Sequence, residues 1–341
     1  MKIINANYQN QTVKIYFGEN FIDNNWELLE RDRKYLVVTD QNLNSFYNSL
    51  LSSIPGLVGI IPVVPGEYSK SLDTYHMIIT ILQEYQLTKN DVIIGFGGGV
   101  VTDICGFVAG TYRRGINFIN IPTSLIGMVD ASIGGKCGLN MNTFKNQIGL
   151  IYHPTKVLID TSFLKTLEKR QLVSGMAEII KIAITKDEKI YNELCNLPST
   201  YLDDLSVLNN LIYKSICQKI KITQKDEFDN HKRHILNFGH TIGHLIETES
   251  DFMITHGEAV AMGMVAETSN PEVLESLISL LKKYQLLNKK IDKLDYLSLI
   301  SSDKKVESGT ISLLYIESIG HSKLKKYKLE NLTNEQFWKE Y

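Results

Sequence analysis

Histidine side chains concentrate in one stretch of the second half of the chain. Five of the eight histidines lie between residues 231 and 256, and His240, His244 and His256 stand beside or near glycines. Imidazole is the commonest metal ligand in proteins, and histidine also carries protons near neutral pH. The cluster therefore indicates a metal-dependent reaction.

The spacing of these histidines leaves their roles open. His240 and His244 are four residues apart and share one helix face, which permits joint metal binding or one ligand and one acid/base or substrate contact. No glutamate follows His240, which excludes the HExxH protease pattern. Glu178 lies in the apolar segment GMAEIIK, where an acid needs a metal or Lys181 as partner. Glu178 and two histidines would form a catalytic zinc site.

A glycine-rich turn, GFGGGVVTD at 95–103, follows an apolar segment in the first half. Glycines let the backbone approach a phosphate, and the N–H groups that begin a helix attract anions. Val100 replaces the third glycine of the dinucleotide-binding fingerprint. Phosphate binding and an ordinary strand-to-helix turn are equally compatible with this segment.

Other polar residues follow the predicted strands. Asp40 and Asn42 would bind ribose hydroxyls or cap a helix, and PGEYSKS at 65–71 would by default be a solvated turn. The segment MVDASIGGK at 128–136 is followed by Asn140, Lys145 and Asn146. Lysines and amides on a glycine-rich segment suit a phosphorylated, hydroxylated ligand, and we rank a basic surface hairpin lower.

Alternating apolar runs and helical spacing predict an α/β first domain over residues 1–164. Continuous apolar runs are typical of parallel strands covered on both faces. We expect such strands at 35–39, 59–64, 91–96, 116–121 and 156–160, and helices at 71–85 and 100–111. This order of elements predicts a mostly parallel sheet.

Helical segments dominate the second predicted domain, residues 165–341. We expect helices at 168–185, 205–224, 235–249, 257–268 and 271–284, and a strand pair at 310–315 and 325–329. The absence of a proline- or serine-rich linker predicts tight packing, with the active site between the domains.

Composition narrows the class of protein. The 341 residues are 43% apolar and carry a net charge of −2, which gives no sign of a nucleic-acid partner. The four cysteines are scattered, as in a reduced cytosolic protein. We see neither a signal peptide nor an apolar run long enough to span a membrane. A cytoplasmic location is expected.

The chain resembles the 3-dehydroquinate synthase family of sugar phosphate cyclases. The matching segments, in family order, are PGEYSKSL, GGGVVTD, TYRRG, IPTSL, VDASIGGK, KNQIG, GMAEIIK, LNFGHTIGH, HGEA and DKK. Each segment alone is weak evidence, whereas the set, which extends from Asp40 to Gly320, is highly specific. The resemblance implies a dehydroquinate synthase-like fold, with a Rossmann-like NAD-binding α/β domain before a mostly helical metal-binding domain.

The resemblance also implies roles for individual residues. Glu178, His240 and His256 would hold zinc, or else cobalt, and His244 would contact the substrate. NAD would be bound by Asp40, Asn42, Glu67, Lys70, Gly98, Gly99, Val100, Asp103, Thr123, Ser124, Ile126, Asp130, Lys136, Lys145, Phe163 and Thr166. The substrate's phosphate and carboxylate would be bound by Lys136, Asn146, Lys181, Lys219, Arg233, Asn237 and Lys304 or Lys305. Arg114 would reach across the interface of a homodimer.

The implied reaction converts 3-deoxy-D-arabino-heptulosonate 7-phosphate into 3-dehydroquinate and phosphate, in the shikimate pathway to chorismate and the aromatic amino acids. NAD would oxidise the C5 hydroxyl, phosphate would leave, the hydride would return, and an intramolecular aldol step would close the ring. Metal coordination would lower the pKa of the reacting hydroxyl. Cations and amides would hold both anionic ends of the substrate. Because the substrate phosphate can take the C6 proton, no protein base is assigned.

Some features depart from the family, and rival functions remain. Thr102 and Cys137 replace a common glycine and threonine, and 265–271 is shorter than we expect. A cyclase acting on glucose 6-phosphate or sedoheptulose 7-phosphate would not bind a carboxylate. The carboxylated substrate is favoured by the presence of Lys219, Arg233 and Asn237, together with Asp130 and Lys136. A polyol dehydrogenase of related fold would release NADH and need fewer cations. A regulatory NAD-binding protein would not need the metal ligands.

Overall fold

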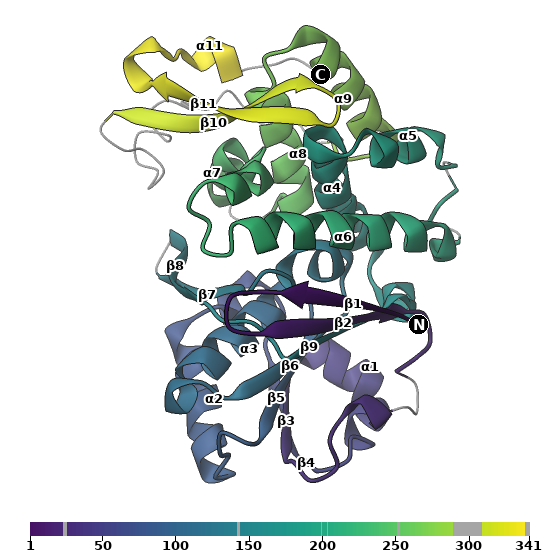
Figure 1. Cartoon of the computed structure of the whole chain (residues 1–341), viewed down its shortest axis with the longest axis vertical. Coiled ribbons are helices and arrows are strands. Elements are labelled where there is room, and N and C mark those ends of the chain that lie inside the picture. Colours follow the sequence, from purple (N-terminus) through teal and green to yellow (C-terminus); the bar gives the residue numbers. More distant parts are fainter. Residues whose placement is uncertain are drawn as a thin grey trace. The chain divides into compact units, whose positions relative to one another are not determined.

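The computed structural model describes residues 1–22, 26–141, 144–198, 200–202, 204–250, 253–288 and 309–337. Contacts within the chain divide it into two units, Met1–Leu167 and Glu168–Tyr341 (Figure 1). Lys304 and Lys305, which we expected at the substrate, lie outside the described residues. None of the described helices is long and apolar enough to cross a membrane.

A seven-stranded sheet with the order β1-β2-β9-β6-β5-β3-β4 organises the first unit. Its strands are β1 (Lys2–Asn7), β2 (Thr12–Gly18), β3 (Tyr35–Asp40), β4 (Leu57–Val63), β5 (Val92–Gly97), β6 (Asn117–Pro122) and β9 (Lys156–Asp160). All neighbours pair in parallel except β1 and β2. The expected mostly parallel sheet is confirmed, and its inner strand β5 is buried along its whole length, as cover on both faces requires.

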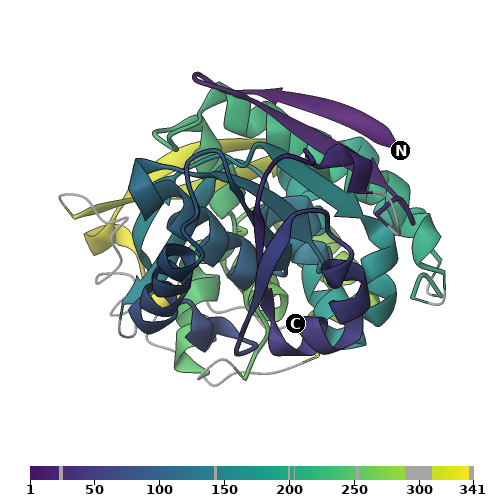
Figure 2. The ribbon, with the colours of Figure 1, turned by 90° about the horizontal axis from the view of Figure 1, so that it is seen from below.

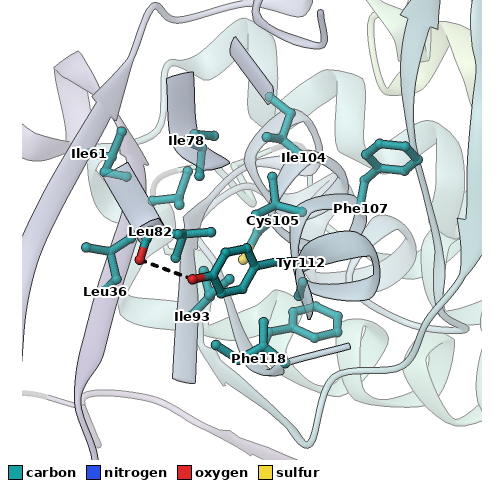
Figure 3. Close-up of a cluster of buried hydrophobic side chains, with 14 of the residues drawn as sticks. Leu36, Ile61, Ile78, Leu82, Ile93, Ile104, Cys105, Phe107, Tyr112 and Phe118 are labelled. Atoms are coloured by element: carbon teal, nitrogen blue, oxygen red, sulfur yellow. Dashed lines mark hydrogen bonds between the residues drawn. The ribbon is translucent and has the colours of Figure 1, made fainter. Parts of the chain in front are cut away.

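Helices cover both faces of this sheet. In Figures 1 and 2, α1 (Gln41–Ser52) lies on one face, and α2 (Leu72–Glu84) and α3 (Gly99–Thr111) lie on the other. Figure 3 shows Leu36 and Ile93 of the sheet packed with Leu82 of α2 and Ile104 of α3. The hydroxyl of Tyr112 donates to the carbonyl of Leu82 at 3.3 Å, which ties the end of α3 to α2. This core holds α3, and with it the glycine-rich turn, against the ends of the strands.

A hairpin follows the glycine-rich segment that ends at Lys136. It consists of β7 (Lys136–Met141) and β8 (Phe144–Ile151), and it is preceded by a wide helical turn, Gly127–Ala131. A short helix, Thr161–Thr166, ends the first unit. This hairpin carries three of the candidate ligand-binding residues, Lys136, Lys145 and Asn146, whose binding role stays a prediction.

The second unit is mainly helical. Its described elements include α4 (Lys169–Lys186), α5 (Glu188–Asn196), α6 (Asn209–Lys225), α7 (His240–Glu249), α8 (His256–Glu267), α9 (Pro271–Lys283), α11 (Asn334–Phe337) and the hairpin β10 (Thr310–Ser318) with β11 (His321–Lys328). The expected single helix at 235–249 is wrong. A short helix, η7 (Lys232–Asn237), precedes α7, because Gly239 adopts a left-handed backbone with φ of 77°.

Candidate metal, anion and nucleotide sites

One carboxylate and two imidazoles meet inside the second unit. Glu178 comes from α4, His240 begins α7, and His256 begins α8. The Oε1 atom of Glu178 lies 3.6 Å from Nε2 of His240 and 3.5 Å from Nε2 of His256. One ligand atom from each of the three residues lies within 4.8 Å of the others. These atoms are therefore close enough to share one metal ion.

The burial of Glu178 supports the same conclusion. Its side chain is 2% exposed, and neither carboxylate oxygen accepts a well-formed hydrogen bond from the described residues. Lys181, one turn further along α4, forms an ion pair with it. A buried carboxylate that faces two imidazoles and lacks such hydrogen bonds suits a divalent cation of the zinc or cobalt type.

His244 lies outside the Glu178–His240–His256 group, which is one of the two arrangements that its spacing from His240 left open. Its ring centroid lies 5.2 Å from that of His240 and 6.2 Å from that of His256. Its ligand atoms group with those of Glu247 and His256, and not with those of Glu178. His244 is therefore beside the Glu178 group, where it could contact a molecule bound there.

A capping box forms the start of α8. The hydroxyl of Thr255 accepts a hydrogen bond from the backbone N–H of Glu258 at 3.4 Å, and the Glu258 carboxylate accepts one from the backbone of Thr255 at 2.8 Å. Thr255 is therefore the cap, and His256 is the first residue of the helix. Arg170 of α4 lies 2.8 Å from both Glu258 and the carbonyl of Met253. These contacts tie the start of α8 to α4.

Close backbone contacts bring α4, α7 and α8 together. The N–H of Gly257 donates to the hydroxyl of Ser174 at 2.8 Å, and a Cβ on Gly257 would lie only 1.9 Å from the carbonyl oxygen of Ser174. A Cβ on Gly263 would lie 2.0 Å from the carbonyl oxygen of Gly239. Only glycine permits these distances, so α8 can approach α4 at one end and the start of α7 further along.

A buried acid holds the start of α7. The Glu267 carboxylate, at the end of α8, accepts hydrogen bonds from the backbone N–H groups of Gly239, Thr241 and Ile242 at 2.9, 3.2 and 3.3 Å. A carboxylate is favourable there because these N–H groups lack partners within the helix and carry partial positive charge. Glu267 thereby fixes the turn that presents His240.

The charges of the Glu178 group follow from its surroundings. Burial raises the pKa of Glu178, but Lys181 and His256 outweigh burial and lower this pKa to about 2. Burial lowers the pKa of His256, but Glu178 and Glu247 outweigh it and raise this pKa to about 9. Because a metal ligand must be deprotonated, a metal ion would have to displace a proton from His256.

Three cationic side chains are buried on α4, α6 and η7. Lys181 is 1% exposed, Lys219 of α6 is 4% exposed and Arg233 of η7 is 3% exposed. The three elements pack on one another. Asn237 is half-buried at the end of η7. Buried cationic side chains on three packed elements are the kind of group that binds an anionic ligand.

Asp226 organises the loop that carries Arg233. Its carboxylate accepts hydrogen bonds from the backbone N–H groups of Asn230, His231 and Arg233 at 2.9, 2.7 and 2.9 Å. The guanidinium of Arg233 donates to the carbonyl of Glu227 at 2.9 Å. Burial opposes ionisation of Asp226, but the backbone hydrogen bonds outweigh it and lower the pKa to about 2.

We expect Asp226→Asn to destabilise the protein in a pH-dependent way. The pKa of Asp226 is depressed in the folded protein. Its stabilisation should therefore be present above the unfolded pKa of about 4 and lost as the pH falls towards 2. Urea unfolding at stepped pH should show a constant deficit in the variant between about pH 7 and 5 that shrinks below about pH 4. The exposed Asp32→Asn is the control, and a deficit that grew on acidification would contradict this assignment.

The predicted nucleotide-binding residues of the first unit lie at the ends of adjacent strands. Gly98 and Gly99 follow β5 and begin α3, and no described side chain caps this helix start. Thr123 follows β6, and its backbone donates to the carbonyl of Gly97 at 3.0 Å. Val100 is the second residue of α3, and the side chain of Ser124 lies next to Gly98. Ile126 and Asp130 belong to the helical turn around Gly127–Ala131, which packs on α3. An open helix start at the edge of a parallel sheet can hold a phosphate.

Asp40 is the last residue of β3, at the same edge of the sheet, and Asn42 lies in the first turn of α1. The carboxylate of Asp40 accepts a hydrogen bond from the backbone N–H of Leu43 at 2.9 Å. Asp40 therefore caps α1, which is one of the two roles that the sequence suggested for it. Asn42 is exposed on α1. The capping contact leaves the second carboxylate oxygen of Asp40 available for a ribose, so this role stays a prediction.

A partly buried network of polar contacts joins four of the predicted residues, Glu67, Lys70, Asp103 and Asn146. The Lys70 ammonium lies 2.7 Å from the Asp103 carboxylate and 2.6 Å from the side-chain oxygen of Asn146. Asn140 donates to the Glu67 carboxylate at 2.8 Å, which links the turn after β4 to the β7–β8 hairpin. Burial raises the pKa of Asp103 although Lys70 lowers it. The segments at 65–71, 95–103 and 136–146 thus meet.

Phe163 and Thr166 meet α1 through a residue that sequence analysis missed. The hydroxyls of Tyr47 and Thr166 are 2.8 Å apart, and the Tyr47 ring centroid lies 5.2 Å from that of Phe163. Phe96 of β5 completes this aromatic group at 5.1 Å from Phe163. Tyr47 belongs to none of the recognised motifs. The signal that could have identified it is an aromatic residue in the polar helix that follows Asp40.

Arg114 is exposed on the turn after α3, and its role across a dimer interface stays a prediction.

Comparisons with known proteins agree over nearly the whole chain. The family model of the 3-dehydroquinate synthase N-terminal domain matches residues 60–174, and that of the 3-dehydroquinate synthase C-terminal domain matches residues 175–306. The 3-dehydroquinate synthase of Sulfurisphaera tokodaii is 36% identical, with 97% of each chain covered.

Solved structures show the same fold. The 2-epi-5-epi-valiolone synthase of Streptomyces hygroscopicus subsp. jinggangensis, with NAD+ and Zn2+ bound, superposes with a TM-score of 0.88 at 22% identity, over 97% of this chain and 96% of that chain. A 2-deoxy-scyllo-inosose synthase complexed with carbaglucose-6-phosphate, NAD+ and Co2+ superposes with a TM-score of 0.87 at 24% identity, over 96% and 97%. The family models and the sequence identity, supported by this fold, show that the chain belongs to the 3-dehydroquinate synthase family of the shikimate pathway.

Proposed function

We propose that this enzyme converts 3-deoxy-D-arabino-heptulosonate 7-phosphate into 3-dehydroquinate and phosphate, and that it uses NAD catalytically with one divalent metal ion. The observation that carries the proposal is the buried Glu178–His240–His256 group, together with buried cations on the packed elements α4, α6 and η7. A metal-capable group next to buried positive charge suits a substrate that is both hydroxylated and anionic.

We assign the metal to Glu178, His240 and His256, and NAD to the first unit. The donor set and the orphaned oxygens of Glu178 fit Zn2+, with Co2+ as the alternative. The open start of α3 fits the pyrophosphate of NAD, and Asp40 fits a ribose. When bound, NAD supplies a reversible hydride acceptor, and the metal supplies a Lewis acid.

The side chains of the chain itself bind and orient the substrate. Lys219 and Arg233, together with Asn237, offer the fixed donors that a carboxylate and a phosphate require. Lys181 balances the charge of Glu178 and keeps it ionised. His244 lies beside the Glu178 group, where its ring can donate to or accept from a substrate hydroxyl. Holding both anionic ends at once fixes the reacting carbons, which lowers the entropic part of the barrier.

We further propose that the enzyme is a homodimer to which Arg114 contributes across the interface. Arg114 is exposed on a tight turn with φ of 62°, as a side chain offered to a neighbour must be. Sedimentation at micromolar concentration should show a dimer, and a monomer would contradict the proposal.

A cytoplasmic location stays a prediction from the scattered cysteines.

The proposed function is tested by phosphate release from 3-deoxy-D-arabino-heptulosonate 7-phosphate, with catalytic NAD and Zn2+, before and after chelation. We expect release that depends on metal and leaves no net NADH, because the hydride returns within each turnover. No release, with NAD and metal shown to be bound, would instead assign another sugar phosphate. Steady accumulation of NADH with a polyol would assign a dehydrogenase.

A further inference from the structure

A second buried carboxylate faces the metal-capable group from the opposite side of His256. Glu247 lies on α7, three residues after His244 and on the same helix face, and is 6% exposed. Its Oε2 atom lies 3.4 Å from Nδ1 of His256. The other ring nitrogen, Nε2, faces Oε1 of Glu178 at 3.5 Å. The two nitrogens of this one imidazole thus face two different carboxylates.

The neighbouring histidine shows the same arrangement. Nδ1 of His240 lies 3.2 Å from the carbonyl oxygen of Phe238, and its Nε2 faces Glu178 at 3.6 Å. Because a carbonyl oxygen only accepts hydrogen bonds, the proton of a neutral His240 ring belongs on Nδ1. The lone pair is then on Nε2, the atom that points at Glu178. In His256 the corresponding acceptor is the carboxylate of Glu247.

We propose that Glu247 is a positioning residue: it accepts the Nδ1 proton of His256, and so holds the ring with its Nε2 lone pair towards the metal. This inference rests on the proposed metal site and deepens it. A neutral imidazole carries a single proton, so an acceptor at Nδ1 selects the tautomer that can ligate through Nε2. A carboxylate that orients a ligating histidine also makes the ring more basic and the metal more tightly bound.

The same atoms allow one rival arrangement. Glu247, His244 and His256 also have ligand atoms within 4.8 Å of one another, so Glu247 could itself ligate a second ion. If that ion used Nδ1 of His256 while Nε2 served the Glu178 group, the ring would have to lose both protons. A positioning role requires no such loss, and it matches the arrangement at His240.

The test compares metal affinity in three variants of the full-length protein. Metal-free protein is titrated with Zn2+ against a chromophoric chelator, and with Co2+ while its visible absorption is recorded. We expect Glu247→Ala to weaken Zn2+ binding about 10- to 100-fold and to alter the Co2+ spectrum. Glu247→Gln keeps an acceptor oxygen and should lose less. Glu249→Gln, an exposed change two residues further along α7, should leave affinity and spectrum unchanged.

Each outcome supports or overturns the inference. Wild-type affinity in both Glu247 variants would overturn it, as would a second bound Co2+ per chain that either variant removes. Thermal unfolding of the metal-free variants shows whether a loss of metal affinity comes from misplaced orientation of His256 or from a less stable fold. If Glu247→Ala does not fold, the metal affinity of Glu247→Gln decides the test. Glu178→Gln tests the metal site itself: if it binds Zn2+ as well as the wild type, the proposed metal site fails. If only the Glu247 variants match the wild type, the inference alone fails.

Discussion

Glu178→Gln is expected to abolish turnover and metal binding while leaving NAD binding intact. The change keeps the size of the side chain but removes the only carboxylate of the proposed Glu178–His240–His256 site. Loss of a residue that merely orients a ligand weakens metal binding about 10- to 100-fold, so loss of a ligand should exceed about 100-fold. Metal content after gel filtration, phosphate release and calorimetric titration with NAD measure the three effects. NAD affinity should persist because its proposed site lies in the first unit.

The Glu178→Gln experiment needs a control for Lys181, the buried ion-pair partner of Glu178. Glu178→Gln leaves the charge of Lys181 buried without its ion pair, which by itself destabilises the fold. The double variant Glu178→Gln with Lys181→Met removes both charges and should recover stability, but neither metal binding nor turnover. Glu168→Gln, an exposed change just before α4, should behave as the wild type. Metal-dependent turnover in the double variant would disprove the assignment of Glu178 as a ligand.

Gly257→Ala is expected to destabilise the protein by about 3 kcal/mol or more and to weaken metal binding in the molecules that fold. The added Cβ would lie 1.9 Å from the carbonyl oxygen of Ser174 and 2.6 Å from its Cα and carbonyl carbon. Because these are backbone atoms, α8 would have to move away from α4, and His256 at its start would move with it. Urea unfolding and Zn2+ competition give the two quantities.

Ser174→Ala separates the steric effect from a lost hydrogen bond. It removes the hydroxyl that accepts from the N–H of Gly257 at 2.8 Å, but it leaves both backbones in place. The expected cost is about 1–3 kcal/mol for the unsatisfied N–H, with metal binding nearly retained. Equal metal affinity in Gly257→Ala and the wild type would mean that the close approach of α8 to α4 does not position His256.

The central sheet was predictable because its strands are apolar throughout. β3, β5, β6 and β9 are buried on both faces, and such runs stand out in a sequence without any alignment. The edge strand β1 was missed because most of its side chains are exposed, so it shows no continuous apolar run. The break between η7 and α7 was missed because Gly239 and the cap from Glu267 act together, and Glu267 lies 28 residues away.

The amino-acid sequence by itself determined the kinds of groups available and the family. Histidines at 240, 244 and 256, an acid in an apolar helix and glycines before a helix are local features, and their order along the chain matched the family. Only the tertiary structure decided which of them meet. Glu178 lies next to His240 and not His244, and Lys70 pairs with Asp103. Glu247 lies beside His256, and Glu267 binds the backbone of the turn that precedes His240. Contacts between residues far apart in sequence depend on how helices and strands pack, and local spacing does not determine that packing.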